Sequence, residues 1–172
     1  VYRRADDLVG RLRQKLPPDT VFVVMSDHGF HSFRRGVNLN TWLVQNGFMV
    51  FEGQESGTKG LADLLGKGKF WEGVDWGKTR AYAVGLGQIY FNLKGRESKG
   101  IVAAGPKYQA LQEEIATKLG GLLDPETGER VMRAVYRRDD MYKGDYVQSA
   151  PDLQVGFNDG YRVGWQDTLG GV

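Results

Sequence analysis

A short apolar run that ends in an acidic residue and a histidine is the feature that most constrains the fold. Residues 21–25 are all apolar, and Ser26, Asp27, His28 and Gly29 follow directly. A run that is apolar on both faces is typical of a central parallel strand. Because ligands bind beyond the carboxyl ends of strands in open α/β sheets, we expect Asp27 and His28 to lie at a site. One carboxylate and one imidazole suit a divalent cation such as zinc.

The rest of the chain alternates between helical and strand patterns. Apolar residues at helical spacing predict helices over residues 5–16, 39–46 and 106–119. Apolar or alternating runs predict further strands at residues 48–51, 82–84, 89–93, 131–137, 153–157 and 161–165, with a hairpin turn at 158–160. The pattern predicts an α/β fold with an antiparallel portion in the second half.

The organisation of the chain indicates one partial domain over residues 1–172. Residues 1–51 read as helix, strand, metal motif, helix and strand, and residues 81–172 as a mixed α/β second half. Residues 52–80 begin with a stretch rich in Gly and Lys, which predicts a surface excursion. The sequence begins at Val1 and enters a helical pattern at once, so we interpret it as a piece of a larger domain.

Composition argues against several classes of partner. The net charge of +2 gives no reason to expect nucleic acid or an anionic membrane surface as a partner. No apolar run approaches the roughly 20 residues of a membrane span. The absence of cysteine excludes disulfides and thiolate zinc sites. Composition indicates neither the compartment nor the oligomeric state.

Five segments carry a family resemblance. They are residues 26–30 (Ser-Asp-His-Gly-Phe), 35–40, 80–83, 87–92 and 150–153. Together they resemble the type I phosphodiesterase/nucleotide pyrophosphatase branch of the alkaline phosphatase superfamily, over the whole length of the chain. The resemblance implies an alkaline-phosphatase-like α/β fold with a mostly parallel central sheet flanked by helices. It implies hydrolysis of phosphate mono- or diesters through a covalent phospho-enzyme. It also implies a small phosphate-ester substrate and two divalent metal ions, with zinc as the first choice and manganese as the second.

The resemblance assigns Asp27 and His28 to the metal ion beside the nucleophile. The family's other ligands and its nucleophile do not carry over. His28 and His31 are the only histidines, and no Asp-x-x-x-His spacing occurs. The resemblance therefore implies at most one partial metal site and no catalytic nucleophile in this chain, and we expect the isolated piece to be inactive.

Four further residues are candidates for contacting substrate or supporting a ligand: His31, Arg34, Arg35 and Asn92. Guanidinium groups pair with phosphate oxygens, but surface salt bridges are the favoured role for Arg34 and Arg35. A solvent-facing loop position is the favoured interpretation of His31, and plain loop contacts are that of Asn92. Asp152 follows a proline before a predicted strand, which favours a turn cap over a metal ligand.

Two alternatives to a phosphodiesterase or phosphatase remain. The chain could be a non-catalytic binding module that retains the fold, in which Asp27 and His28 form only a turn pair. Within the same superfamily it could belong to a phosphomutase or a sulfatase. The nucleophile would separate these enzymes, and it is not in this chain.

Overall fold

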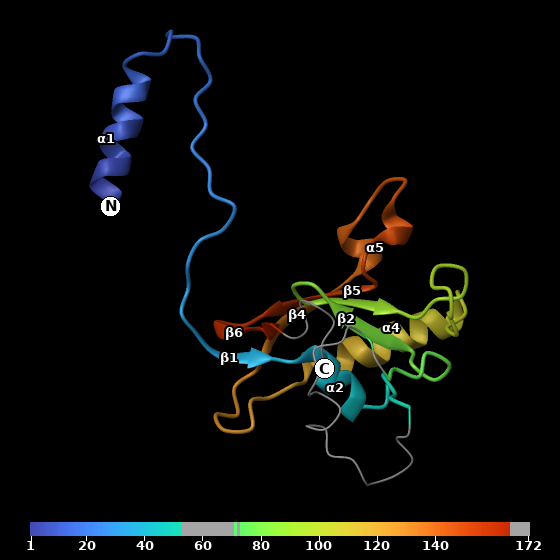
Figure 1. The fold of residues 1–172 in the computed structure, drawn as a ribbon. Coiled ribbons are helices and arrows are strands. Elements are labelled where there is room, and N and C mark those ends of the chain that lie inside the picture. The colour runs from blue at the N-terminus through green and yellow to red at the C-terminus, as the bar shows by residue number, and fades with distance from the viewer. Residues whose placement is uncertain (53–70, 72, 166–172) are drawn as a thin grey trace. The chain divides into compact units, whose positions relative to one another are not determined.

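The computed structural model describes residues 1–52, 71 and 73–165, and the contacts divide the chain into two units, Val1–His31 and Ser32–Val172 (Figure 1). Its elements, in chain order, are α1 (Tyr2–Arg13), β1 (Phe33–Val37), α2 (Leu39–Gln45), β2 (Ala81–Val84), β3 (Gln88–Phe91), α4 (Pro106–Gly120), β4 (Met132–Arg137), α5 (Arg138–Met141), the 3-10 helix η1 (Val147–Ser149), β5 (Leu153–Phe157) and β6 (Gly160–Val163). Among the described residues, no helix is long and apolar enough to cross a membrane.

The first unit confirms the predicted N-terminal helix but not the strand after it. Helix α1 is amphipathic, yet none of its residues is buried. Residues 21–25 form no strand, and their side chains are between 38% and 86% exposed. A strand needs a neighbouring strand to take its backbone hydrogen bonds, and residues 1–31, all of which are described, contain no strand with which residues 21–25 could pair. The apolar run therefore lies outside any sheet.

The second unit contains a four-stranded antiparallel sheet with the order β2-β3-β5-β4. This confirms the α/β class and the antiparallel portion predicted for the second half of the chain. The β2–β3 turn is tight because Gly85 and Gly87 both adopt positive φ angles, of 72° and 88°. A Cβ at Gly87 would also meet the Val155 carbonyl oxygen at 3.0 Å.

The predicted hairpin between β5 and β6 is wrong. Strand β6 pairs with β1 instead, in parallel, and this two-stranded sheet is the parallel sheet of the described chain. The physical reason is that β5 already has β3 on one side and β4 on the other, so it has no free edge for β6. Asn158 also bonds toward β4: its backbone N–H donates to the Val131 carbonyl and its Nδ2 to the Arg130 carbonyl.

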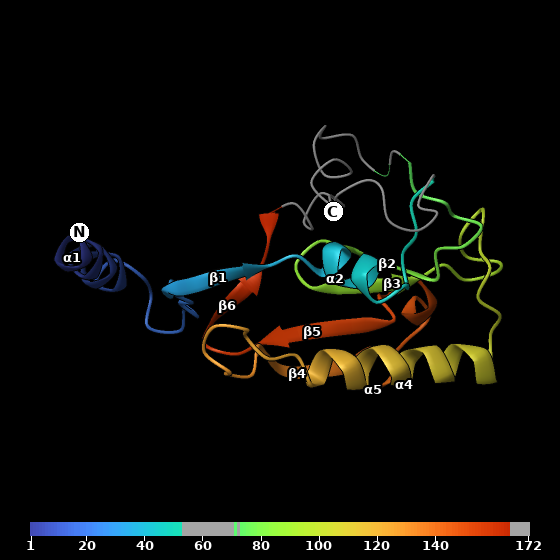
Figure 2. The ribbon, with the colours of Figure 1, turned by 90° about the horizontal axis from the view of Figure 1, so that it is seen from below.

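Two predicted helices cover the antiparallel sheet. Helix α4 packs against β4 and α2 against β2 (Figure 2). Pro106 begins α4, as predicted, and the predicted apolar stripe is buried: Tyr108, Leu111, Ile115 and Leu119. Asn38 caps α2 by accepting the Thr41 N–H at 2.9 Å. These local signals were sufficient to predict the positions of α2 and α4, because each signal acts within a few residues along the chain.

Asn40 satisfies the backbone hydrogen bonds of one residue, Ala83, on the edge strand β2 of the antiparallel sheet. Its Nδ2 donates to the Ala83 carbonyl at 2.8 Å, and its Oδ1 accepts the Ala83 N–H at 2.7 Å. Because β2 is an edge strand, the fully buried amide replaces one residue of a neighbouring strand.

The predicted surface excursion, residues 52–80, lies largely outside the described residues. The strand predicted at 48–51 is reduced to one antiparallel bridge between Phe51 and Val74. Phe48 and Met49 are nevertheless buried in the core. The single-domain organisation over residues 1–172 stays a prediction.

Candidate metal site

Asp27 and His28 lie side by side, as the sequence predicts. Oδ2 of Asp27 is 3.6 Å from Nε2 of His28, and the two side chains are 87% and 64% exposed. The other carboxylate oxygen, Oδ1, accepts the backbone N–H of His28 at 3.0 Å. The local backbone therefore holds one carboxylate oxygen of Asp27 close to one ring nitrogen of His28.

The second nitrogen of the His28 ring is already used. Nδ1 lies 2.9 Å from the carbonyl oxygen of Gly29, a distance at which Nδ1–H donates to that carbonyl. With the proton on Nδ1, Nε2 carries the lone pair, which is the tautomer that a metal requires. Next along the loop, the Phe30 ring meets the His28 ring edge-on at 5.5 Å.

The spacing of Asp27 Oδ2 and His28 Nε2 fits two of the ligands of one divalent cation. Two ligand atoms on one tetrahedral zinc ion, each bonded at about 2.1 Å, are about 3.4 Å apart. The observed separation of 3.6 Å between Asp27 Oδ2 and His28 Nε2 is close to that value. In the described part of the chain, however, no group of three or more His, Cys, Asp or Glu side chains could hold a metal. Asp27 and His28 thus offer two ligands.

His31 lies three residues further on, in the same loop, and is exposed. It does not join Asp27 and His28 in a group of three metal-ligand side chains within the described chain. Its role in contacting substrate stays a prediction.

The two arginines of β1 are held by acidic residues of the 124–129 turn. Nη2 of Arg34 lies 2.6 Å from Oε2 of Glu129, and Nε of Arg35 lies 2.9 Å from Oδ2 of Asp124. Arg35 also pairs with Glu126, and this hydrogen bond raises the pKa of the Arg35 guanidinium. The salt-bridge alternative is confirmed for both arginines, and a contact with phosphate stays a prediction.

Asn92 is fully buried at one wall of a cavity of about 290 Å³. Its Nδ2 donates to three carbonyl oxygens, of Trp76, Thr79 and Lys99, at 2.9 to 3.1 Å, whereas its Oδ1 is buried without a hydrogen-bond partner in the described structure. The other residues lining this cavity are Trp71, Trp76, Tyr82, Glu97, Ser98 and Lys99. Within this lining the Trp71 and Trp76 rings meet edge-on, with their centroids 5.5 Å apart.

Asp152 was interpreted as a turn cap and is instead the centre of a buried polar network. The carboxylate accepts from the Phe91 N–H and Arg96 Nη2, each at 2.6 Å, and from the Tyr108 hydroxyl at 3.0 Å. Arg138 adds a longer contact at 3.4 Å. These partners lie far from Asp152 in the sequence, so the sequence alone did not indicate the network. The one signal for a buried role was the position of Asp152 at the start of an apolar strand, which implies burial.

The comparison with known families identifies the chain. The family model "Type I phosphodiesterase / nucleotide pyrophosphatase" matches residues 1–170, so the chain belongs to this family. The family is part of the alkaline phosphatase superfamily, is generally metal-dependent and acts on phosphate-ester substrates. No curated protein and no solved structure was found to match the chain.

Proposed function

We propose that this chain forms part of a metal-dependent hydrolase of phosphate mono- or diesters, in which Asp27 and His28 bind one divalent cation. Family membership supports the reaction class. The observation that carries the assignment of residues is the paired geometry of Asp27 Oδ2 and His28 Nε2, 3.6 Å apart and open to solvent.

Each residue has a distinct role in this proposal. The Asp27 carboxylate supplies negative charge, and its second oxygen fixes the His28 backbone. The Gly29 carbonyl oxygen accepts a hydrogen bond from Nδ1–H, which holds that proton on Nδ1 and keeps Nε2 available. A bound zinc or manganese ion would activate a nucleophile and offset charge on the phosphoryl oxygens. Two such ions and a covalent phospho-enzyme complete the proposed chemistry.

We also propose that the 172-residue chain has little activity alone. It contains two histidines and no cysteine, and a catalytic zinc ion normally takes three protein ligands. The test is hydrolysis of bis-p-nitrophenyl phosphate and p-nitrophenyl phosphate with added zinc or manganese. Turnover at ordinary enzyme rates, about 1 s⁻¹ or more, would contradict this part of the proposal.

Zinc binding tests the site itself. Isothermal titration should show one weak zinc site in the wild-type chain. In His28→Ala the zinc affinity should fall by about tenfold or more, because the loss of a residue that only supports a metal ligand already lowers metal affinity by about 10–100-fold. His31→Ala is the matched control and should bind zinc as the wild type does.

The non-catalytic alternative makes the opposite prediction. It is favoured by one observation, that the Asp27 carboxylate already accepts a backbone N–H as an ordinary loop cap does. If zinc uptake is equal in wild type and His28→Ala, Asp27 and His28 form a turn pair and the proposed site is wrong.

A further inference from the structure

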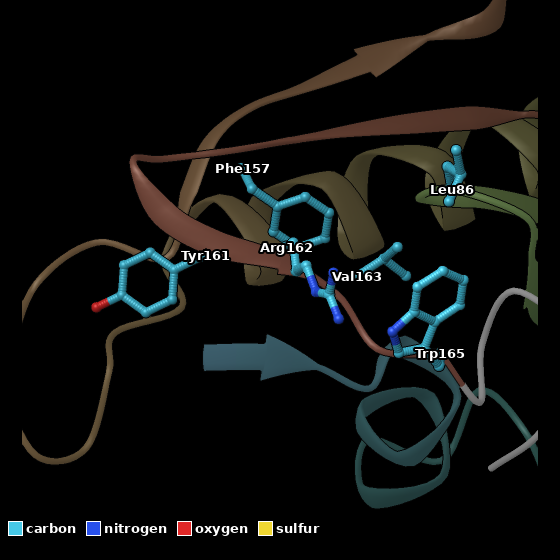
Figure 3. Close-up of a pocket in the computed structure, with 6 residues that line it drawn as sticks. All are labelled: Leu86, Phe157, Tyr161, Arg162, Val163 and Trp165. Carbon is cyan, nitrogen blue, oxygen red and sulfur yellow. The ribbon is translucent and has the colours of Figure 1, made fainter. Parts of the chain in front are cut away.

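A second cavity lies in the unit of residues 32–172, away from the segment that carries Asp27 and His28 in the sequence. It has a volume of about 280 Å³, close to the lower end of the roughly 300–1,000 Å³ typical of small-molecule sites. Figure 3 shows the side chains that line it: Leu86, Phe157, Tyr161, Arg162, Val163 and Trp165. Arg162 is the one charged residue among these six.

One nitrogen of the half-buried Arg162 side chain has no hydrogen-bond partner in the described structure. This nitrogen is Nε, which is itself buried. The neighbouring arginines of β1 differ in this respect, because Arg34 pairs with Glu129 and Arg35 with Asp124. A buried N–H without an acceptor is costly, so the unpaired Nε of Arg162 at an apolar cavity needs an explanation.

The rings of Phe33 and Trp165 lie against the Arg162 guanidinium, and its N–H groups are the atoms with which a ligand would bond. Its central carbon lies 3.7 Å from the centroid of the Phe33 ring and 5.2 Å from that of Trp165. Cation–π contacts use the flat faces of a guanidinium, whereas its N–H groups point outward in the plane. That fork matches the oxygens of a carboxylate or a phosphate.

The apolar walls define the rest of the ligand. Trp165 and Leu86 are 69% and 68% exposed although they line the cavity, so each presents apolar surface that a ligand can cover. Flat rings stack well on an indole. We propose that this cavity binds a small aromatic anion, with its carboxylate or phosphate on Arg162 and its ring against Trp165.

The proposal is tested by calorimetric titration of the 172-residue protein with 1-naphthoate and 1-naphthyl phosphate in EDTA. We expect saturable binding of at least one probe, and the tighter probe identifies the preferred acid group. Arg162→Gln should weaken binding by about tenfold or more, the amount expected for a charge-assisted hydrogen bond. Since no metal is present, failure here is independent of the proposed hydrolase site.

Three controls separate charge recognition from loss of the fold. Arg133→Gln removes an exposed arginine from β4 and should leave binding unchanged. The neutral probe 1-naphthalenemethanol should bind wild type and Arg162→Gln equally, whereas Trp165→Ala should weaken all three probes. The proposal is overturned if neither anion binds the wild type, or if Arg162→Gln binds both anions as tightly as the wild type does.

Discussion

Oδ2 of Asp152 accepts a hydrogen bond from Nη2 of Arg96 at 2.6 Å, and the Asp152 side chain has no exposed surface. This ion pair joins the start of β5 to the loop that follows β3. The same carboxylate also accepts the Phe91 N–H and the Tyr108 hydroxyl, so one acidic group links β3, β5 and α4.

Removing this charge should destabilise the protein strongly. In Asp152→Asn, Arg96 and the buried Arg138 lose their shared counter-charge, and breaking a buried ion pair costs about 3–5 kcal/mol. Urea unfolding should show this loss in the free energy of unfolding. Asp159→Asn, at an exposed position, is the control and should change stability by less than about 0.5 kcal/mol. Equal stability of the two variants would mean that the network contributes nothing.

The stability of the fold should fall in acid, in part through Asp124. The Glu126 backbone N–H, bonded to this carboxylate at 2.9 Å, is the main reason that the pKa of Asp124 lies below its ordinary value of 3.8. Burial of Asp124 opposes this by raising its pKa, whereas the Tyr161 hydroxyl and the Arg35 charge lower it further, so the net pKa is lowered. A group whose pKa is lowered by folding stabilises the native state above its ordinary pKa. That stabilisation is lost as the pH falls through the lowered value.

The measurement is the urea midpoint between pH 6 and pH 2.5. Asp124→Asn should be less stable than wild type at pH 6, and the difference should shrink as the pH falls. Asp145→Asn, at an exposed residue, should follow the wild-type curve. A difference between wild type and Asp124→Asn that stays constant across this range would contradict the assignment.

The cap of α2 should be worth about 1 kcal/mol. Asn38→Ala removes the oxygen that accepts the Thr41 N–H, and the loss of such a cap typically costs about 0.5–2 kcal/mol. Asn38→Asp keeps an acceptor at the same place and should retain most of the stability. Both are measured by urea unfolding, and an equal loss in the two variants would show that the cap hydrogen bond is not the cause.

Two glycines should respond to alanine with opposite signs. A Cβ at Gly100 would lie 1.9 Å from the Leu93 carbonyl oxygen, so Gly100→Ala should cost about 1–3 kcal/mol through forced backbone movement. A Cβ at Gly120, the last residue of α4, meets nothing within 4 Å, and Gly120→Ala should stabilise by up to about 1 kcal/mol. Thermal unfolding of both variants checks this pair, and shifts of the same sign would be inconsistent with the structure.

The sequence predicted the features that depend on neighbours along the chain. Helix α4 is correct in position and in its buried face because Pro106, the apolar stripe and the glycines at its end all act locally. Strands β2 and β3, predicted at residues 82–84 and 89–93, were found for the same reason. Asp27 and His28 are adjacent in sequence, so their proximity also needed no knowledge of the fold.

Features set by distant pairing were not predictable from one sequence. Whether the apolar run at 21–25 becomes a strand depends on a neighbouring strand, and the sequence of the run does not identify that neighbour. The 158–160 turn has the composition of a hairpin, but strands β3 and β4 already flank β5. The Asp152 network and the position of Arg162 over Phe33 likewise join residues far apart in the chain.

The parallel pairing of β1 with β6 has a consequence for biosynthesis. Phe33 is paired with Gly160, so the whole segment between these two residues must be made before this small sheet can close. At roughly 5–20 residues per second, a ribosome needs on the order of ten seconds to make the intervening segment. Of the two described sheets, this one receives its final strand later in synthesis, because β6 follows every strand of the four-stranded sheet in the sequence.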